Sequence, residues 1–299
     1  MLYPPRMINR TFGRTGLNVG ALGFGAGHIG TPDLSEQDAG TLLNRAVDRG
    51  VTLIDTARGY GLSEERVGRH LGWRRQDYVL SSKGGYDVPG TPDWTPDAIR
   101  LGIERALRTL NTDHIDIFHL HSCPLDVLRR DDLLGALDAA RQAGHIRVAA
   151  YSGENDALAW AVSSDRFGSV QTSVNLADQW SVHHALPGAA ERGLGVIGKR
   201  PVANMAWTYR ERPDGQYAEA YWDRLQRLNL PDYGLDRTEL ALRYAAFAPG
   251  VDSVIVGTAR TENLERNVRI VERGPLPADV LHDIETRWQA HGQDWGGEI

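Results

Sequence analysis

Polar side chains follow several apolar runs of the sequence at the points where strands would end. Asp55 follows "VTLI", Lys83 ends "YVLSSK" and His121 ends "HIDIFHLH". Tyr60 lies five residues beyond Asp55, between two glycines. An ammonium group close to a phenol favours the ionised phenol, and a carboxylate can hold that ammonium in place. These residues suit chemistry at a carbonyl or an alcohol, with Tyr60 as general acid/base and His121 as a neutral hydrogen-bond donor.

Apolar runs alternate with segments of helical periodicity, and this alternation predicts the elements that would position those side chains. The predicted strands are "ALGFG", "VTLID", "YVLSSK", "HIDIFHLH", "IRVAAYS", "SVQTSV", "LGVIGK" and "SVIVG". A helical segment follows each strand, and the links are mostly too short to form another domain. The eight units predict an α/β fold, a (β/α)₈ TIM barrel, as a single domain over residues 1–299.

Polar residues mark the starts of several predicted helices. Ser35 and Thr95 are predicted N-caps, and Ser63 is predicted to cap the helix that contains "EERVG". Two segments fall outside the alternation: a long, aromatic-rich loop insertion at 201–235, after the seventh strand, and an extra C-terminal helix and tail at 276–299. Each could lie over the barrel mouth or cover apolar surface elsewhere.

An open, doubly wound sheet is the competing fold. That fold usually carries a glycine-rich phosphate fingerprint after its first strand. The segment "GFGAGHIG" begins as G-x-G but places His28 where the pattern G-x-G-x-x-G needs its third glycine. The barrel is therefore preferred.

Chemistry in a (β/α)₈ barrel belongs at the C-terminal ends of the strands, because the loops there converge on one face. The residues that end the predicted strands are Asp55, Lys83, His121, Ser152, Gln171, Lys199 and Gly257. Such a row at one end of different strands is hard to explain as ordinary loop chemistry. A loop tyrosine by itself more often packs than reacts, but Tyr60 lies beside this row.

A metal site is considered because His119 and His121 form H-x-H. Side chains two apart on a strand point to the same side and could bind zinc. No histidine ends "IRVAAYS" or "SVQTSV" to complete a ligand set. We therefore predict no metal, with His119 as a hydrogen-bonded interior residue one layer deeper.

Lys83 considered alone could form a Schiff base in an aldolase-like barrel. That interpretation leaves "VIVGTARTENLERN" unused. Here the last strand meets Gly257 and Thr258. The helix that follows carries Arg260 at its N-terminus and Arg266 further along. Helix N-termini bind phosphate, and the last βα loops of such barrels are its usual position, so the segment predicts a nucleotide or sugar phosphate.

The composition limits the partners and the compartment. The formal net charge is -6 and no Lys/Arg run resembles a basic arm, so nucleic acid and anionic membranes are poor partners. Cys123 is the only cysteine, which excludes an internal disulfide and any multi-cysteine metal site. The segment "MLYPPRMINRTFG" lacks the apolar core of a signal peptide, and no apolar run approaches the roughly 20 residues that span a bilayer. We predict a cytoplasmic protein.

The ordered motifs of the chain resemble those of the aldo-keto reductases over nearly its whole length. The most specific are "AVDRGVTLIDTARGYGLSEERVGRHLG", "YVLSSKGG", "LNTDHIDIFHLH", "YSGEN" and "GVIGKRP". The resemblance implies a (β/α)₈ barrel with a nicotinamide cofactor, usually NADPH, extended across the barrel mouth. It places the catalytic tetrad at Asp55, Tyr60, Lys83 and His121. Tyr60, tuned by Lys83 and Asp55, would protonate the carbonyl oxygen as hydride reaches the carbon. His121 would orient the carbonyl.

At the nicotinamide end, the resemblance assigns Ser152 and Gln171 to the carboxamide. Gly153 follows the serine where the family usually has asparagine. Lys199 and Arg200 stand where many members have a tyrosine and a serine. They match a basic variant of the family and could serve the pyrophosphate.

At the adenosine end, Gly257 and Asn263 stand where well-known members have lysine and arginine. Arg260 and Arg266 could replace them, because arginine suits a 2′-phosphate. NADP(H) is therefore favoured over NAD(H). The residues implied to bind the cofactor are Ser152, Gln171, Lys199, Arg200, Gly257, Thr258, Arg260, Asn263, Arg266 and Asn267.

The leading prediction is an NADP-dependent oxidoreductase that reduces aldehydes or ketones to alcohols, or catalyses the reverse, on a small-molecule substrate. The alternatives are a Schiff-base lyase that uses Lys83 and a low-turnover, cofactor-binding redox sensor. The sequence selects neither a substrate nor an oligomeric state. The candidates for lining the pocket are His28, Tyr86, Trp94, Tyr151, Trp180 and the 201–235 insertion.

Overall fold

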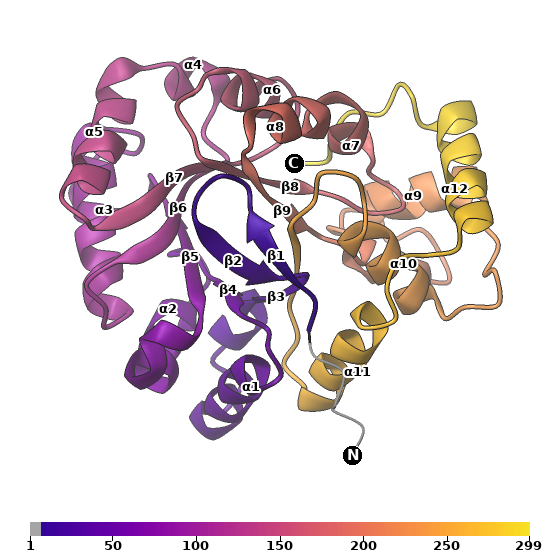
Figure 1. Ribbon diagram of the computed structural model, residues 1–299, viewed down its shortest axis with the longest axis horizontal. Coiled ribbons are helices and arrows are strands. Elements are labelled where there is room, and N and C mark those ends of the chain that lie inside the picture. The colour runs from indigo at the N-terminus through magenta and orange to yellow at the C-terminus, as the bar shows by residue number, and fades with distance from the viewer. Residues whose placement is uncertain (1–6) are drawn as a thin grey trace.

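Eight parallel strands close into a barrel in the computed structural model, which describes residues 7–299 (Figure 1). The order around the barrel is β10-β3-β4-β5-β6-β7-β8-β9. The strands are β3 (Leu22–Gly25), β4 (Leu53–Asp55), β5 (Val79–Gly84), β6 (Ile115–His121), β7 (Ile146–Ser152), β8 (Ser169–Ser173), β9 (Gly195–Lys199) and β10 (Ser253–Val256). The predicted (β/α)₈ TIM barrel is confirmed. Residues 1–6, the start of the N-terminal segment searched for a signal peptide, lie outside the described residues.

Helices surround the barrel on its outer side (Figure 1). They are η1 (Ala26–Gly30), α1 (Glu36–Asp48), α2 (Ser63–Leu71), η2 (Gly72–Asp77), α3 (Pro96–Thr109), α4 (Leu125–Leu128), α5 (Asp131–Gln142), α6 (Asn155–Ser163), α7 (Trp180–His184), α8 (Leu186–Arg192), η3 (Ala203–Thr208), α9 (Glu219–Leu228), α10 (Arg237–Ala246), α11 (Thr261–Val271) and α12 (Ala278–His291). No helix in the described part of the chain has the length and apolar character needed to cross a bilayer.

The parallel register brings the predicted site residues to one end of the barrel. Lys83 pairs with His119 across β5 and β6. His121, Ser152 and Gln171 form a row across β6, β7 and β8. Side chains of successive strand residues point alternately into the barrel and away from it. The register between strands therefore decides which side chains meet inside the barrel.

Two of the predicted helix caps are confirmed. The side chain of Ser35 accepts a hydrogen bond from the backbone N–H of Asp38 at 3.1 Å, ahead of α1. Thr95 accepts one from the backbone N–H of Ala98 at 3.2 Å, ahead of α3. Each bond satisfies a donor that the first turn of a helix leaves unpaired.

The predicted cap at Ser63 is wrong. Leu62 is the cap residue of α2, and Ser63 is its first helical residue. The buried hydroxyl of Ser63 instead donates to the carbonyl oxygen of Ala26 at 2.8 Å and lies 2.8 Å from the hydroxyl of Thr56. The serine therefore ties the loop after β4 to η1, a tertiary contact that the local sequence pattern does not reveal.

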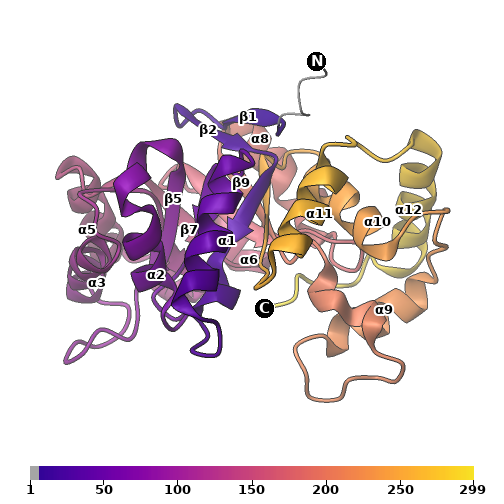
Figure 2. The same cartoon turned by 90° about the horizontal axis from the view of Figure 1, so that it is seen from below.

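A short antiparallel hairpin, β1 (Asn9–Phe12) and β2 (Leu17–Gly20), precedes the barrel and is not predicted from the sequence. Phe12, Leu17 and Val19 pack against inward residues of β4 to β7 and β9. The hairpin therefore closes the N-terminal end of the barrel, and Figure 2 shows it on the side of the molecule opposite the C-terminus. Strands of four residues carry too little alternation to be separated from a loop.

The insertion at 201–235 follows β9, the seventh barrel strand, and is partly helical because it contains η3 and α9. Leu228 of α9 packs with Ile284 and Trp288 of α12 in a cluster beside the barrel. This part of the insertion and the C-terminal helix therefore cover apolar surface, which is one of the two expected arrangements. The tail after α12 takes the other expected arrangement and lies at the barrel mouth, as its contacts described below show.

Candidate active site

A buried ion pair lies at the C-terminal ends of β4 and β5. Nζ of Lys83 lies 2.5 Å from Oδ2 of Asp55 and donates to the carbonyl oxygen of Thr56 at 2.9 Å. Oδ1 of Asp55 accepts hydrogen bonds from the hydroxyl of Ser81 at 2.7 Å and from Nε2 of Gln171 at 3.0 Å. Both charged side chains are 1% exposed. Because each carboxylate oxygen has a donor, hydrogen bonds offset the cost of burying this side chain inside the barrel.

Lys83 keeps its proton despite being buried. Burial by itself lowers the pKa of Lys83, but the carboxylate of Asp55 and the phenol of Tyr60 outweigh that effect and the pKa is raised. The ammonium lies 5.0 Å from the centre of the Tyr60 ring. A Schiff-base lysine needs a neutral amine, which this environment opposes. The pair instead provides a fixed positive charge beside the phenol.

His121 lies on another side of the same phenol. The rings of Tyr60 and His121 have centroids 6.0 Å apart and are nearly perpendicular, at 86°. Burial lowers the pKa of His121 to about 3, and the charges of Lys83 and Lys199 contribute. The imidazole is therefore neutral at physiological pH. Its Nδ1 lies 2.8 Å from the hydroxyl of Tyr86. The structure thus brings all four residues of the predicted tetrad together.

His119 lies one layer deeper, as expected. It is fully buried, and its Nε2 lies 3.2 Å from the hydroxyl of Ser81. The hydroxyl of Ser81 donates to Asp55, so its oxygen is left to accept a hydrogen bond from the imidazole. Burial lowers the pKa of His119 to about 3, so it is neutral. Within residues 7–299 no three His, Cys, Asp or Glu side chains are grouped so that they could hold a metal ion.

Ser152 and Gln171 connect the implied carboxamide site to the ion pair. The hydroxyl of Ser152 donates to Oε1 of Gln171 at 3.0 Å, and Nε2 of Gln171 donates to Asp55. Both residues are 1% exposed. The amide of Gln171 retains a second N–H, and the serine oxygen can still accept a hydrogen bond. The pair can therefore hold a planar amide, which also has one donor group and one acceptor.

Glu154 is a buried carboxylate at the barrel mouth that is not predicted from the sequence. Its Oε1 lies 3.0 Å from Nζ of Lys199 and accepts hydrogen bonds from the backbone N–H and hydroxyl of Ser173, both at 2.9 Å. Its Oε2 accepts from Thr172 at 2.5 Å. Burial lowers the pKa of Lys199, and Glu154 opposes that effect. The available signal was an acid two residues past a strand end, in "YSGEN".

Arg200 contacts the C-terminal tail. Its Nη1 donates to the carbonyl oxygen of Glu298 at 2.5 Å. Asn155 exchanges two hydrogen bonds with Gly297, at 2.9 Å and 2.7 Å. The backbone N–H of Glu298 donates to Asp178 at 2.9 Å. The tail therefore lies at the mouth, beside the residues predicted to serve the pyrophosphate.

Gly257 and Thr258 join β10 to α11. A Cβ at Gly257 would lie 2.3 Å from Nδ1 of His28, so only glycine fits without a shift. The hydroxyl of Thr258 accepts from the backbone N–H of Arg260 at 3.1 Å and from the side chain of Asn263 at 3.3 Å. These contacts fix a close-packed turn at the N-terminus of α11.

The two arginines predicted for the 2′-phosphate differ in their partners. Arg266 bonds to Asp236, the cap of α10, at 2.5 Å. Arg260 is exposed, and its guanidinium has no acidic partner in the described part of the chain. Asn267 is 7% exposed, on the buried side of α11. Arg260 is therefore available to an anion, whereas Arg266 is paired with Asp236 and Asn267 is buried.

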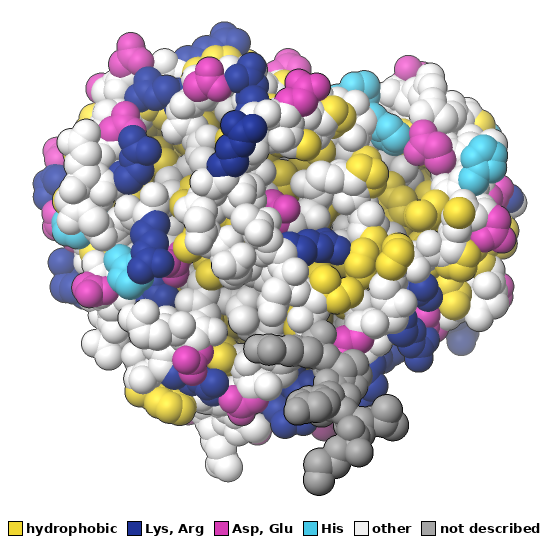
Figure 3. Space-filling model, in the orientation of Figure 1, with side chains coloured by type: hydrophobic (Ala, Val, Ile, Leu, Met, Phe, Trp, Pro, Cys, Tyr) yellow, Lys and Arg dark blue, Asp and Glu magenta, His cyan; other side chains and the backbone are white. Residues whose placement is uncertain are grey.

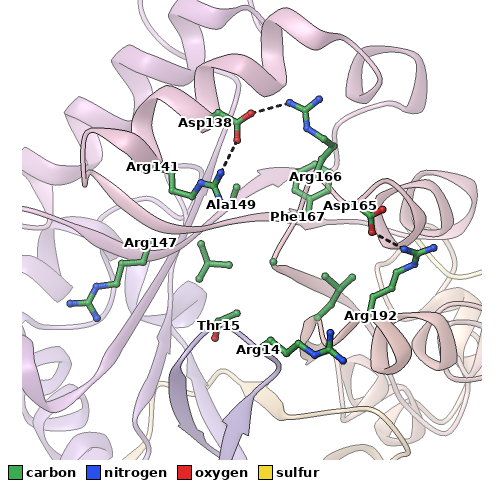
Figure 4. Close-up of a pocket in the computed structure, with 14 residues that line it drawn as sticks. Arg14, Thr15, Asp138, Arg141, Arg147, Ala149, Asp165, Arg166, Phe167 and Arg192 are labelled. Atoms are coloured by element: carbon green, nitrogen blue, oxygen red, sulfur yellow. Dashed lines mark hydrogen bonds and ion pairs between the residues drawn. The ribbon is translucent and has the colours of Figure 1, made fainter.

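A hollow of about 450 Å³ lies at the opposite end of the barrel and contains no tetrad residue (Figure 4). Arginines dominate its lining, but Arg166 pairs with Asp138 at 3.0 Å and Arg192 with Asp165 at 2.6 Å. Arg192 also lies in the last turn of α8, where the helix dipole favours a cation. Figure 3 shows both signs of charge interspersed over this face of the molecule. We therefore place the chemistry at the mouth.

Tyr151 does not line a pocket, so that prediction is wrong. Tyr151 is 2% exposed and its hydroxyl donates to the carbonyl oxygen of Cys123 at 3.2 Å. Its ring packs near Phe167, with centroids 6.3 Å apart. It precedes Ser152 on β7, and successive strand residues point to opposite faces. The inward position belongs to the serine.

The family model described as "Aldo/keto reductase family" matches residues 21–289 of the chain. Among curated proteins, L-galactose dehydrogenase of Arabidopsis thaliana is 28% identical over 296 residues, covering 92% of each chain. A probable voltage-gated potassium channel subunit beta, also of Arabidopsis thaliana, is 26% identical over 316 residues, covering 93% of this chain and 95% of that protein.

Among solved structures, the holo form of aldo-keto reductase AKR11C1 from Bacillus halodurans is similar over most of the molecule. The TM-score is 0.83 at 27% identity, with 94% of this chain and 96% of that chain covered.

Proposed function

The chain belongs to the aldo/keto reductase family, and from this premise we propose that it is an NADP(H)-dependent oxidoreductase that interconverts a carbonyl and an alcohol, with Tyr60 as general acid/base. The observation that carries the proposal is the buried Lys83–Asp55 pair beside Tyr60 and the neutral His121. We also propose that residues 1–299 form one domain. A cytoplasmic location is proposed as well, since a single cysteine fits a reducing compartment.

Tyr60 transfers the proton in this proposal. In the reductive direction its hydroxyl gives a proton to the carbonyl oxygen, and in the oxidative direction its phenolate takes one from the alcohol. Lys83 stabilises the phenolate in both cases, because it stays charged next to Asp55. Positioned acid/base groups of this kind contribute about 10²- to 10⁴-fold to a rate.

His121 supplies a hydrogen bond rather than a charge. Its pKa is lowered to about 3 by burial, so the imidazole remains neutral across the working range of pH. A neutral N–H can donate to the developing alkoxide without competing with Tyr60 for the proton. This division leaves proton transfer to Tyr60 and orientation of the substrate to His121.

The residues at the mouth fit a nicotinamide dinucleotide. Ser152 and Gln171 are a buried donor and acceptor set suited to the carboxamide. Lys199 and Arg200 are the residues proposed for the pyrophosphate, with Lys199 also paired to Glu154 and Arg200 also bonded to the carbonyl oxygen of Glu298. The turn at Gly257 allows close approach of the backbone at a helix N-terminus. When bound, the nicotinamide gives hydride to the carbonyl carbon or takes it from the alcohol.

The preference for NADP(H) rests on Arg260. We expect Arg260→Ala to raise the Kd for NADPH by about tenfold, because it removes a charge-assisted contact to the 2′-phosphate. The Kd for NADH should change by less than about twofold. The matched control is Arg266→Ala, because Arg266 is already bonded to Asp236. Fluorescence titration of both cofactors measures the effect, and an equal loss for NADPH and NADH would contradict this role.

A panel of aldehydes, ketones, sugars and sugar alcohols, assayed with both cofactors in both directions, tests the function as a whole. Sugars are included because one relative is an L-galactose dehydrogenase. Steady turnover of at least one substrate class with NADPH or NADP supports the proposal. Slow cofactor oxidation by every compound would favour a low-turnover, cofactor-binding redox sensor instead.

A further inference from the structure

The two nitrogens of His121 have different surroundings. Nδ1 lies 2.8 Å from the hydroxyl of Tyr86, and the two rings are 5.6 Å apart and tilted by 42°. Nε2 has no protein partner within residues 7–299, and it is not among the buried atoms that lack one. It therefore remains accessible at the mouth, on a ring that also adjoins Tyr60.

The loop between β5 and α3 holds Tyr86 in this position. The ring centroids of Trp94 and Tyr86 are 6.0 Å apart. The backbone N–H of Trp94 donates to the carbonyl oxygen of Gly85 at 2.7 Å. On another side, the backbone of Gly59 lies so close to the Tyr86 hydroxyl that a Cβ at this position would be only 2.9 Å from it. Asp87 and Trp94 adopt φ of 55° and 56°, a strained conformation that persists only where the surroundings impose it. The hydroxyl is thus fixed against Nδ1.

Both partners in this hydrogen bond are neutral. Burial lowers the pKa of His121 to about 3 and raises the pKa of Tyr86. A neutral imidazole carries its proton on one nitrogen only. Tyr86 therefore either donates to a bare Nδ1, which leaves the proton on Nε2, or accepts from Nδ1–H, which leaves Nε2 bare.

Donor and acceptor strengths favour the first arrangement. A phenol O–H is a stronger donor than a neutral imidazole N–H, and the bare imidazole nitrogen is a stronger acceptor than a phenol oxygen. The hydroxyl of Tyr86 also has no other acceptor in the described residues. We infer that Tyr86 donates to Nδ1 of His121 and thereby holds the imidazole proton on Nε2, the atom that faces the substrate.

The consequence for catalysis rests on the proposed function. With its proton on Nε2, His121 donates a hydrogen bond to the substrate oxygen. With Nε2 unprotonated, the lone pair of that nitrogen would face the substrate oxygen, and no hydrogen bond could form between them. Tyr86 is therefore a positioning residue that acts through His121, and the proton transferred in the reaction still belongs to Tyr60.

NMR of the protein labelled with ¹⁵N-histidine reads the tautomer directly, in the absence of substrate. The loss of one set of signals in His121→Gln assigns the ring. We expect a pyridine-type resonance for Nδ1 and a pyrrole-type resonance for Nε2 in the parent, and a mixture of tautomers in Tyr86→Phe. A parent protonated on Nδ1, or a Tyr86→Phe protein that keeps the parent's tautomer unchanged, overturns the inference.

Kinetics provide the second measurement. Tyr86→Phe should lower kcat by about tenfold, the value of one hydrogen bond, with the Kd for NADPH within about twofold of the parent. The matched control is Tyr78→Phe, since the buried hydroxyl of Tyr78 has no partner in residues 7–299. An unchanged kcat in Tyr86→Phe overturns the positioning role. If the parent itself turned over no carbonyl, the proposed function would fail, while the NMR measurement would still decide the tautomer.

Discussion

Replacing Tyr60 with phenylalanine is expected to lower kcat by about a thousandfold and to leave the Kd for NADPH within about twofold. The change removes only the hydroxyl that exchanges the proton. The ring that lies 5.0 Å from the ammonium of Lys83 and beside His121 is retained. The loss should therefore appear in the chemical step and not in cofactor binding.

Single-turnover oxidation of bound NADPH, followed optically, separates that step from product release. Tyr78→Phe again serves as the control, because it deletes a tyrosine hydroxyl that lies away from the mouth and has no hydrogen-bond partner in residues 7–299. A Tyr60→Phe protein that turned over within a fewfold of the parent would rule out Tyr60 as the acid/base, whatever its effect on affinity.

The second large effect is expected for Lys83→Met. This variant leaves the carboxylate of Asp55 buried at 1% exposure without its cation. Removing one partner of a buried pair typically costs about 3–5 kcal/mol of the free energy of unfolding. Turnover should fall as well, by about a hundredfold or more, because no charge remains to stabilise the phenolate of Tyr60. Chemical denaturation and steady-state kinetics measure the two effects separately.

The double variant Asp55→Asn/Lys83→Met distinguishes a structural role of the pair from a catalytic one. Once both charges are gone, neither position holds a buried ion without its partner, so we expect part of the lost stability to return. Turnover should not return, because the phenol still lacks its cation. Strictly additive losses of stability would show that the two residues do not act as a pair, and recovered turnover would contradict the role assigned to Lys83.

Three residues of the tetrad could be predicted because they lie at strand ends. An apolar run that stops at a polar residue marks both the strand and its end, and parallel strands in a barrel bring those ends together. Asp55, Lys83 and His121 were found in this way, and the register confirms that they share one end of the barrel. Tyr60 lies in a loop, and it was included because it follows Asp55 by five residues, on the face of the barrel where the predicted strands end.

Other features could not be predicted because they depend on contacts between distant segments. The hairpin of β1 and β2 is too short for a periodic signal, yet it closes one end of the barrel. Ser63 has the residue type of a helix cap, but its hydroxyl donates to the carbonyl oxygen of Ala26. Likewise, the tail residue Glu298 reaches Arg200 across 98 positions of the sequence.

The sequence by itself determined the eight strands, the parallel barrel and the polar side chains that end its strands, because hydrophobic periodicity and strand ends are local properties. Only the tertiary structure decided what those side chains bond to. It gave Asp55 three donors, paired Lys199 with Glu154, and set Tyr86 against His121. Charge state and tautomer depend on burial and on neighbours from other strands, and those neighbours are fixed only when the barrel closes.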